Sequence, residues 1–246
     1  TCIAGPNSVG KSNLFDAIEF LSLLSDHYFL EACTLIRPTP QQRSDVSSLF
    51  STRVIQGHDN LRLAAEMILP SPVLDEFSQQ VEPERTFVRY DVEIAAEKGT
   101  SLSTGLQLRL VNEQLSPIPS AKDHLRFPDS TNYVKRFVHG AHKFFPLSTT
   151  EENGNTIIQI QNGSRGRPRK IAANNAQRTV LSATASAENP IILAAQAEMR
   201  SWRFVALEPS AMRAPDDVVE ARPISATGAH IPSSLFRQEL QEGDGS

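Results

Sequence analysis

A glycine-rich segment at the start of the chain has the residue types that bind phosphate groups. It fits the pattern G-x-x-x-x-G-K-S and consists of Gly5, Pro6, Asn7, Ser8, Val9, Gly10, Lys11 and Ser12. The two glycines allow backbone conformations closed to other residues, so that successive N–H groups can point at phosphate oxygens. The ammonium group of Lys11 would reach the β- and γ-phosphates of ATP, and the hydroxyl group of Ser12 would bind the Mg²⁺ that bridges them. The pattern therefore predicts a site for ATP and Mg²⁺.

This kind of loop requires a strand before it and a helix after it. Residues 2–4 form a short apolar stub, as expected for the end of a strand. After the loop, apolar residues recur at mostly three- and four-residue spacing: Leu14, Phe15, Ile18, Leu21 and Leu24. This spacing predicts a helix from Ser12 to about Asp26 that packs one face on a sheet. The N-terminus of that helix would then point at the phosphates.

Composition and charge exclude several classes of protein. The 246 residues carry a formal net charge of −4, which argues against a basic surface over the whole molecule but leaves room for a local basic patch. The two cysteines, Cys2 and Cys33, lack the spacing of a zinc site or a disulfide framework. No apolar run approaches the length of a membrane span, and no secretory signal pattern opens the chain. We therefore expect a cytoplasmic protein without a membrane partner.

Three segments alternate apolar and polar residues with the period of a half-buried strand. They cover residues 61–69, 88–94 and 106–110. Turn-forming residues at 97–100 predict that the second and third segments form a hairpin. Because strands in the core of a parallel sheet are apolar on both faces, this alternation indicates antiparallel strands.

The second half of the chain predicts shorter elements. A strand is expected over residues 156–160, after a turn at 152–155. Asn189-Pro190 predicts a helix start, and that helix would run to about Arg200. Another strand is expected over residues 202–207. Polar connectors are expected at residues 37–42 and 117–132.

The sequence G-P-N-S-V-G-K-S-N followed by L-F-D-A-I-E-F-L resembles the ATPase heads of the RecF/SMC/ABC-like class, whose loop typically carries asparagine at the positions of Asn7 and Asn13. Residues 189–190, 202–213 and 228–236 resemble the AAA family ATPase subgroup of that class. The resemblance implies an α/β fold, a P-loop NTPase of ABC-ATPase-like type with a mixed sheet and an antiparallel β-subdomain. Residues 5–13, Asn13 included, would then bind the nucleotide, and Ser12 would bind the metal.

The resemblance also implies a function and partners. ATP binding, and ATP hydrolysis in the full-length protein, would drive dimerisation with a second ATPase head. Such ATPases act in DNA repair and in anti-phage defence, so DNA and a nuclease or effector protein are expected partners. Two alternatives remain open: a P-loop kinase or nucleotide-dependent transferase, and a nucleotide-binding module without turnover.

The catalytic residues are left unassigned by the sequence. A Walker B strand should end in two acidic residues, whereas residues 204–209 offer only Glu208. The family's metal-sensing glutamine could be Gln41, Gln42 or Gln177. Because Thr1 directly precedes the first expected strand and the signature motif is missing, we expect residues 1–246 to be the N-terminal lobe of a head, incomplete at both ends.

Two polar segments need a separate interpretation. Residues 165–170 read R-G-R-P-R-K, which resembles the core of an AT-hook that enters the minor groove of DNA; the alternative is a basic hairpin or loop that contacts phosphates. His139 and His142 form an H-x-x-H pair, but without nearby cysteine or acidic partners they are not expected to bind metal.

Overall fold

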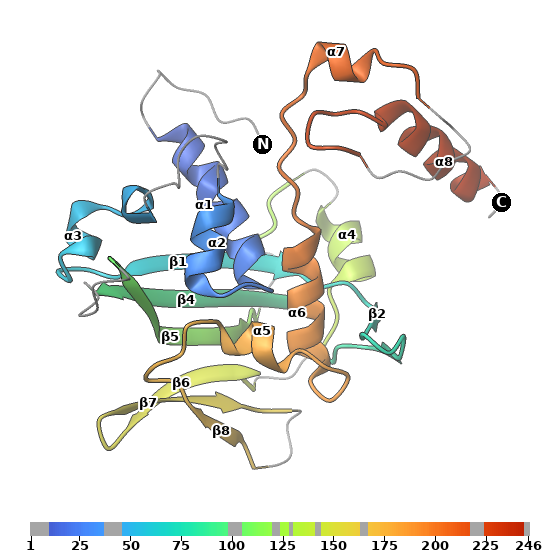
Figure 1. The fold of residues 1–246 in the computed structure, drawn as a ribbon. Helices are drawn as coiled ribbons and strands as arrows, with labels where there is room; N and C mark the ends of the chain where they lie inside the picture. Colours follow the sequence, from blue (N-terminus) through green and yellow to red (C-terminus); the bar gives the residue numbers. More distant parts are fainter. Residues whose placement is uncertain are drawn as a thin grey trace. The chain divides into compact units, whose positions relative to one another are not determined.

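The computed structural model describes most of the chain, which divides into two compact units. The described residues are 10–36, 46–97, 105–119, 124–127, 130–140, 144–162, 167–216 and 224–243. The first unit spans Thr1–Trp202 and the second Arg203–Ser246. We describe each unit by itself (Figure 1).

A six-stranded sheet forms the centre of the first unit (Figure 1). Every strand pair among the described residues is antiparallel. The strand order is β1 (Leu61–Ile68), β4 (Phe87–Glu97), β5 (Gln107–Pro117), β6 (Leu147–Glu152), β7 (Asn155–Ile160) and β8 (Arg169–Ala172). A separate small sheet pairs β2 (Val73–Leu74) with β3 (Gln80–Val81). The fold is therefore mixed α/β, and the predicted antiparallel strands and the β4–β5 pairing are confirmed. The mixed sheet that the resemblance implies is not seen among the described residues, because none of their strand pairs is parallel.

Two local features shape this sheet, a tight hairpin turn and a β-bulge. The β6–β7 hairpin turns at Asn153 and Gly154, which both have positive φ (53° and 74°). Two-residue hairpin turns of this kind require positive φ at both positions, and asparagine and glycine adopt it most readily. In the β4–β5 pair the register shifts at Glu93/Ile94, and Val111 is the extra residue on β5. This bulge reverses which β5 residues face the core.

Four helices of the first unit lie over one face of the sheet (Figure 1). These are α1 (Lys11–Leu24), α2 (Phe29–Leu35), α5 (Val180–Thr184) and α6 (Pro190–Ser201). The predicted helices after the glycine-rich loop and after Asn189 are thus confirmed. Short elements complete the described part: η1 (Val46–Leu49), α3 (Thr52–Ile55) and α4 (Ser130–Phe137). The core between sheet and helices includes fully buried Leu24, Phe29, Tyr90, Leu110 and Ile192.

Helix α1 is buried along its second half only. Phe20, Leu21 and Leu24 are at most 4% exposed, whereas Leu14, Phe15 and Ile18 are 40–44% exposed. The apolar spacing had predicted one continuous buried face. That expectation is wrong for the first half, because the described hydrophobic core takes in α1 only from Phe20 onward.

The second unit contains α7 (Pro209–Met212) and α8 (Ile231–Gly243). The strand predicted over residues 202–207 is wrong, because this segment is irregular. Its backbone is held instead by bonds from the N–H of Ala206 to the carbonyl of Ala226 (2.7 Å) and from the N–H of Glu208 to that of Thr227 (2.9 Å). Phe204 is 53% exposed, so the apolar side chains that suggested a buried strand lack the packing that a strand in a sheet would give them.

None of the described helices combines the length and the apolar character that crossing a bilayer would demand.

Candidate functional site

The N-terminal end of α1 is the described part of the predicted phosphate site. Gly10 precedes the helix with φ 90° and ψ 12°, a left-handed conformation that favours glycine. The carbonyl of Gly10 accepts the first helical bond from the N–H of Leu14 (3.3 Å). The side chains of Ser12 and Asn13 are exposed in the first turn. Five predicted site residues lie outside the described residues: Gly5, Pro6, Asn7, Ser8 and Val9.

The charge at this helix end suits an anion. The first turn of α1 carries no acidic residue. The first N–H groups of a helix have no partner within the helix, and the helix dipole places partial positive charge there. With Lys11 as the first helical residue, a phosphate group would meet N–H donors and a cation without a competing carboxylate.

The opposite end of α1 is anchored by side chains from far along the chain. The hydroxyl of Thr179 donates to the carbonyl of Leu24 (2.9 Å), and the buried amide of Gln196 donates to the carbonyl of Ser25 (2.9 Å). The guanidinium of Arg200 binds the carboxylate of Asp26 (Nε to Oδ1, 2.6 Å). The last carbonyls of a helix lack intrahelical partners, so these bonds satisfy them and place cationic charge where the dipole is negative. Helix α1 is therefore held to α5 and α6 at its C-terminal end.

A buried carboxylate, Glu113, joins the sheet to α5. Its side chain accepts bonds from the hydroxyl of Tyr90 (3.0 Å) and from the N–H groups of Val180 (2.6 Å) and Leu181 (2.9 Å). Glu113 is fully buried, and this burial raises its pKa from 4.5 to about 7, against the three hydrogen bonds that lower it. The carboxylate thus caps α5, next to Thr179, the residue that anchors α1.

Sequence reasoning missed Glu113 because of the β-bulge. Strict alternation from Leu108 and Leu110 would place residues 112 and 114 toward the core and Glu113 toward solvent. The extra residue Val111 reverses this order, so that Glu113 and Leu115 face the core. No local sequence pattern in β5 marks a bulge. The only available sign was a glutamate between the apolar residues Val111 and Leu115, at alternate positions of the strand.

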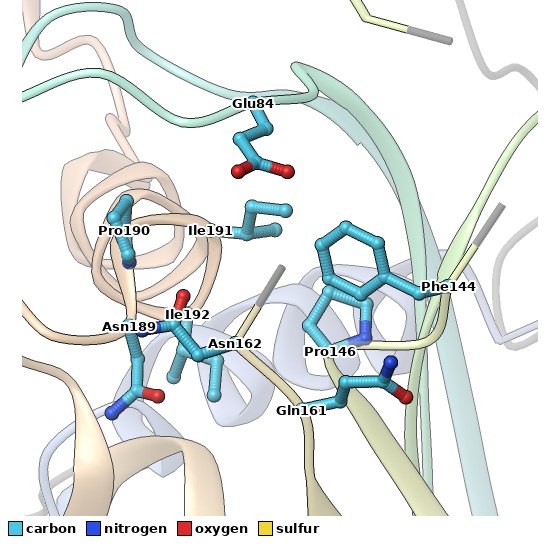
Figure 2. A pocket seen from close by; sticks show the side chains of 9 residues that line it. All are labelled: Glu84, Phe144, Pro146, Gln161, Asn162, Asn189, Pro190, Ile191 and Ile192. Carbon is cyan, nitrogen blue, oxygen red and sulfur yellow. The ribbon is translucent and has the colours of Figure 1, made fainter. Parts of the chain in front are cut away.

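Two hollows lie beside the N-terminal end of α6. The first, of about 30 Å³, is shown in Figure 2, where the Glu84 carboxylate points toward Ile191, and Phe144 and Pro146 form the facing wall. The second, of about 170 Å³, shares three residues with the first: Gln161, Asn162 and Asn189. It is also lined by Ile160, Arg167, Arg169 and Glu188. The two hollows therefore adjoin each other at the end of β7 and the start of β8, and together they are named the groove beside α6.

The remaining sequence candidates are dispersed. Gln177 is exposed, and its backbone carbonyl accepts a bond from the N–H of Phe29; Gln41 and Gln42 lie outside the described residues. Glu208 is an exposed residue at the start of α7. Within the described ranges, no three His, Cys, Asp or Glu side chains gather as metal ligands, and His142 falls in a gap between those ranges.

The basic segment forms part of the sheet. Arg165 and Gly166 lie outside the described residues, but β8 starts at Arg169 and pairs with β7, with Arg169 opposite Ile160. An AT-hook needs an extended backbone that is free to enter a groove. The pairing of β8 with β7 favours the alternative interpretation, a basic hairpin.

Comparison of the chain with known protein families, curated proteins and solved structures gives no match. Function must therefore be inferred from the residues and their geometry.

Proposed function

We propose that this chain binds Mg-ATP at the N-terminal end of α1, as part of an ATPase head of the RecF/SMC/ABC-like class. The observation that carries the proposal is the helix start: α1 begins at Lys11 of the G-x-x-x-x-G-K-S pattern, directly after a left-handed Gly10. A P-loop requires this change from a glycine turn to a helix. A lysine and a serine in a chance glycine turn would not need to open a helix of 14 residues.

The site residues would have distinct roles. Backbone N–H groups of residues 5–10, except Pro6, which has none, would surround the β-phosphate, and the ammonium group of Lys11 would balance the charge of the β- and γ-phosphates. The exposed hydroxyl of Ser12 would be a ligand of Mg²⁺. Asn13, also exposed in the first turn, completes the asparagine pattern with Asn7.

The described sheet supports the ABC-like class over a P-loop kinase. A kinase of this type would need a compact parallel core, and the mixed sheet of the ABC-like class would also need parallel strands, whereas all described strand pairs are antiparallel. What favours the ABC-like class is the antiparallel subdomain. An antiparallel subdomain packed against the helix that follows the loop is what the ABC-like class implies. The anchoring of α1 by Thr179 and Gln196 would hold this helix in place while its other end binds phosphate.

Hydrolysis in the full-length protein would require an acidic group that orients water. Glu113 is enclosed by hydrogen bonds and Glu208 is exposed at the start of α7, so we assign the catalytic role to neither. In this proposal a second head completes the site, and ATP-driven dimerisation acts on DNA or on a nuclease or effector partner in DNA repair or anti-phage defence. A nucleotide-binding module without turnover is the second candidate, and it would be favoured if the full-length protein also lacked the acidic pair.

Isothermal titration with Mg-ATP tests the proposal. Lys11→Ala should abolish measurable binding, because the triphosphate loses its main cationic partner. Lys135→Ala, on the exposed surface of α4, is the matched control and should bind like the wild type. Ser12→Ala should lower affinity in Mg²⁺ but change it little in EDTA. Equal affinity of the wild type and Lys11→Ala would refute the proposal.

A further inference from the structure

The groove beside α6 carries a second inference, which does not depend on the proposed ATP site. Its wider hollow, of about 170 Å³, is lined by the guanidinium-bearing residues Arg167 and Arg169. These residues are two positions apart, with Pro168 between them, and both side chains are exposed. Two cationic side chains therefore border one small cavity.

Neither of these two arginines forms an ion pair with another described residue. By contrast, the neighbouring Lys170 pairs with Glu152 across the hairpin. Because alternate residues of a strand point to opposite faces, Lys170 is directed away from the face of Arg169.

The wall of the hollow is fixed by hydrogen bonds. The amide of Asn162, after β7, donates to the carbonyl of Glu188, and the amide of Asn189 donates to the carbonyl of Thr184 (3.1 Å). The NH₂ group of Asn162 keeps a second hydrogen that can serve as a donor, whereas that of Asn189 also donates to the hydroxyl of Ser186 (3.5 Å). The connection from α5 to α6 is thereby tied to the end of the hairpin that carries the arginines.

We propose that this hollow binds a phosphate monoester. Guanidinium groups match the oxygens of phosphate with paired N–H donors, and two of them can balance a dianion. The volume of about 170 Å³ admits a phosphate group with a compact substituent. The adjoining hollow of about 30 Å³ has room for only about one water molecule, so it adds little space for the substituent.

One residue of the hollow opposes an anion and gives the proposal a directional test. Glu188 lines the same hollow and, like the arginines, takes part in none of the ion pairs between described residues. Its carboxylate would repel the phosphate. Removing this charge should strengthen binding, whereas removing a guanidinium should weaken it.

The experiment is a titration with inorganic phosphate at constant ionic strength, followed by NMR of the arginine Nε–H groups. All proteins carry Lys11→Ala, so that phosphate cannot bind at the glycine-rich loop. The parent should show saturable shifts. Arg169→Gln and Arg167→Gln should each weaken binding by about tenfold or more, as expected for the loss of a charge-assisted hydrogen bond. Glu188→Gln should strengthen it several-fold, and Lys170→Gln, which removes the same charge from the other face, should leave it unchanged.

Three results would overturn the proposal. The first is the absence of saturable shifts, and the second is equal weakening of phosphate binding by Lys170→Gln and Arg169→Gln. The third comes from a parallel titration with a single-stranded oligonucleotide without terminal phosphate, if the protein binds this oligonucleotide and not inorganic phosphate. The last result would assign the arginines to a nucleic-acid backbone. Because the background already lacks Lys11, none of these results bears on ATP binding. Unchanged thermal unfolding of each variant, expected for exposed side chains, confirms that the proteins compared are folded.

Discussion

The buried carboxylate of Glu113 should make the stability of the first unit depend on pH. Burial raises its pKa from 4.5 to about 7, so the folded state binds the proton more tightly than the unfolded state. The resulting contribution to the free energy of unfolding is complete below about pH 4.5 and is lost as pH rises through 7. A shift of this size corresponds to a loss on the order of 3 kcal/mol across that window.

Glu113→Gln isolates this contribution, because the amide keeps the volume of the side chain but does not titrate. The variant should lose the part of the pH dependence that comes from Glu113. It should also be less stable than the wild type at pH 4.5 by about 1–3 kcal/mol, since an amide NH₂ group must then face an N–H donor of Val180 or Leu181.

Urea unfolding between pH 4.5 and 8, followed by the fluorescence of Trp202 in the first unit, measures both effects. Other titrating groups act equally on both proteins, so the difference between them at each pH reports Glu113. Glu151→Gln, an exposed glutamate on β6, serves as the control and should follow the wild type. If the free energy of unfolding of Glu113→Gln falls with pH as steeply as that of the wild type, Glu113 does not titrate as described.

Three further predictions concern single residues. Thr179→Val should lower the free energy of unfolding by about 1–2 kcal/mol, because it removes the N-cap of α5 and the bond to the carbonyl of Leu24, and Thr179→Ser should restore most of it in urea unfolding. Gly140→Ala should cost roughly 2–4 kcal/mol by the same measurement, because Gly140 has φ 94° and a Cβ there would overlap the carbonyl of Glu84; equal stability would contradict this geometry. Burial raises the pKa of the Cys33 thiol to about 12, so Cys33 should resist alkylation at pH 8 in the folded protein and react after denaturation, as measured by peptide mass spectrometry.

Local patterns predicted the elements whose own residues decide them. The spacing of apolar residues after the loop predicts α1, and the proline after Asn189 predicts the start of α6. The alternation over residues 61–69, 88–94 and 106–110 predicts antiparallel strands, and the structure confirms all three predictions. These predictions succeed because helix and strand periods are set by neighbours within a few residues. The phosphate-binding role of residues 5–9 stays a prediction.

The tertiary structure decided what depends on distant partners. Residues 202–207 have the composition of a strand, but the bonds that Ala206 and the following Glu208 donate to residues 226–227 do not build a strand ladder, and no strand forms. Glu113 faces the core because a bulge at Val111 shifts the register. The backbone N–H groups that donate hydrogen bonds to its carboxylate belong to residues almost 70 positions later in the chain. The sequence by itself determined the helical or strand periodicity of these elements and the residue pattern of the glycine-rich segment. Tertiary packing alone decided which faces are buried and which charged groups lie inside the protein. Burial depends on contacts with residues that are distant in the sequence.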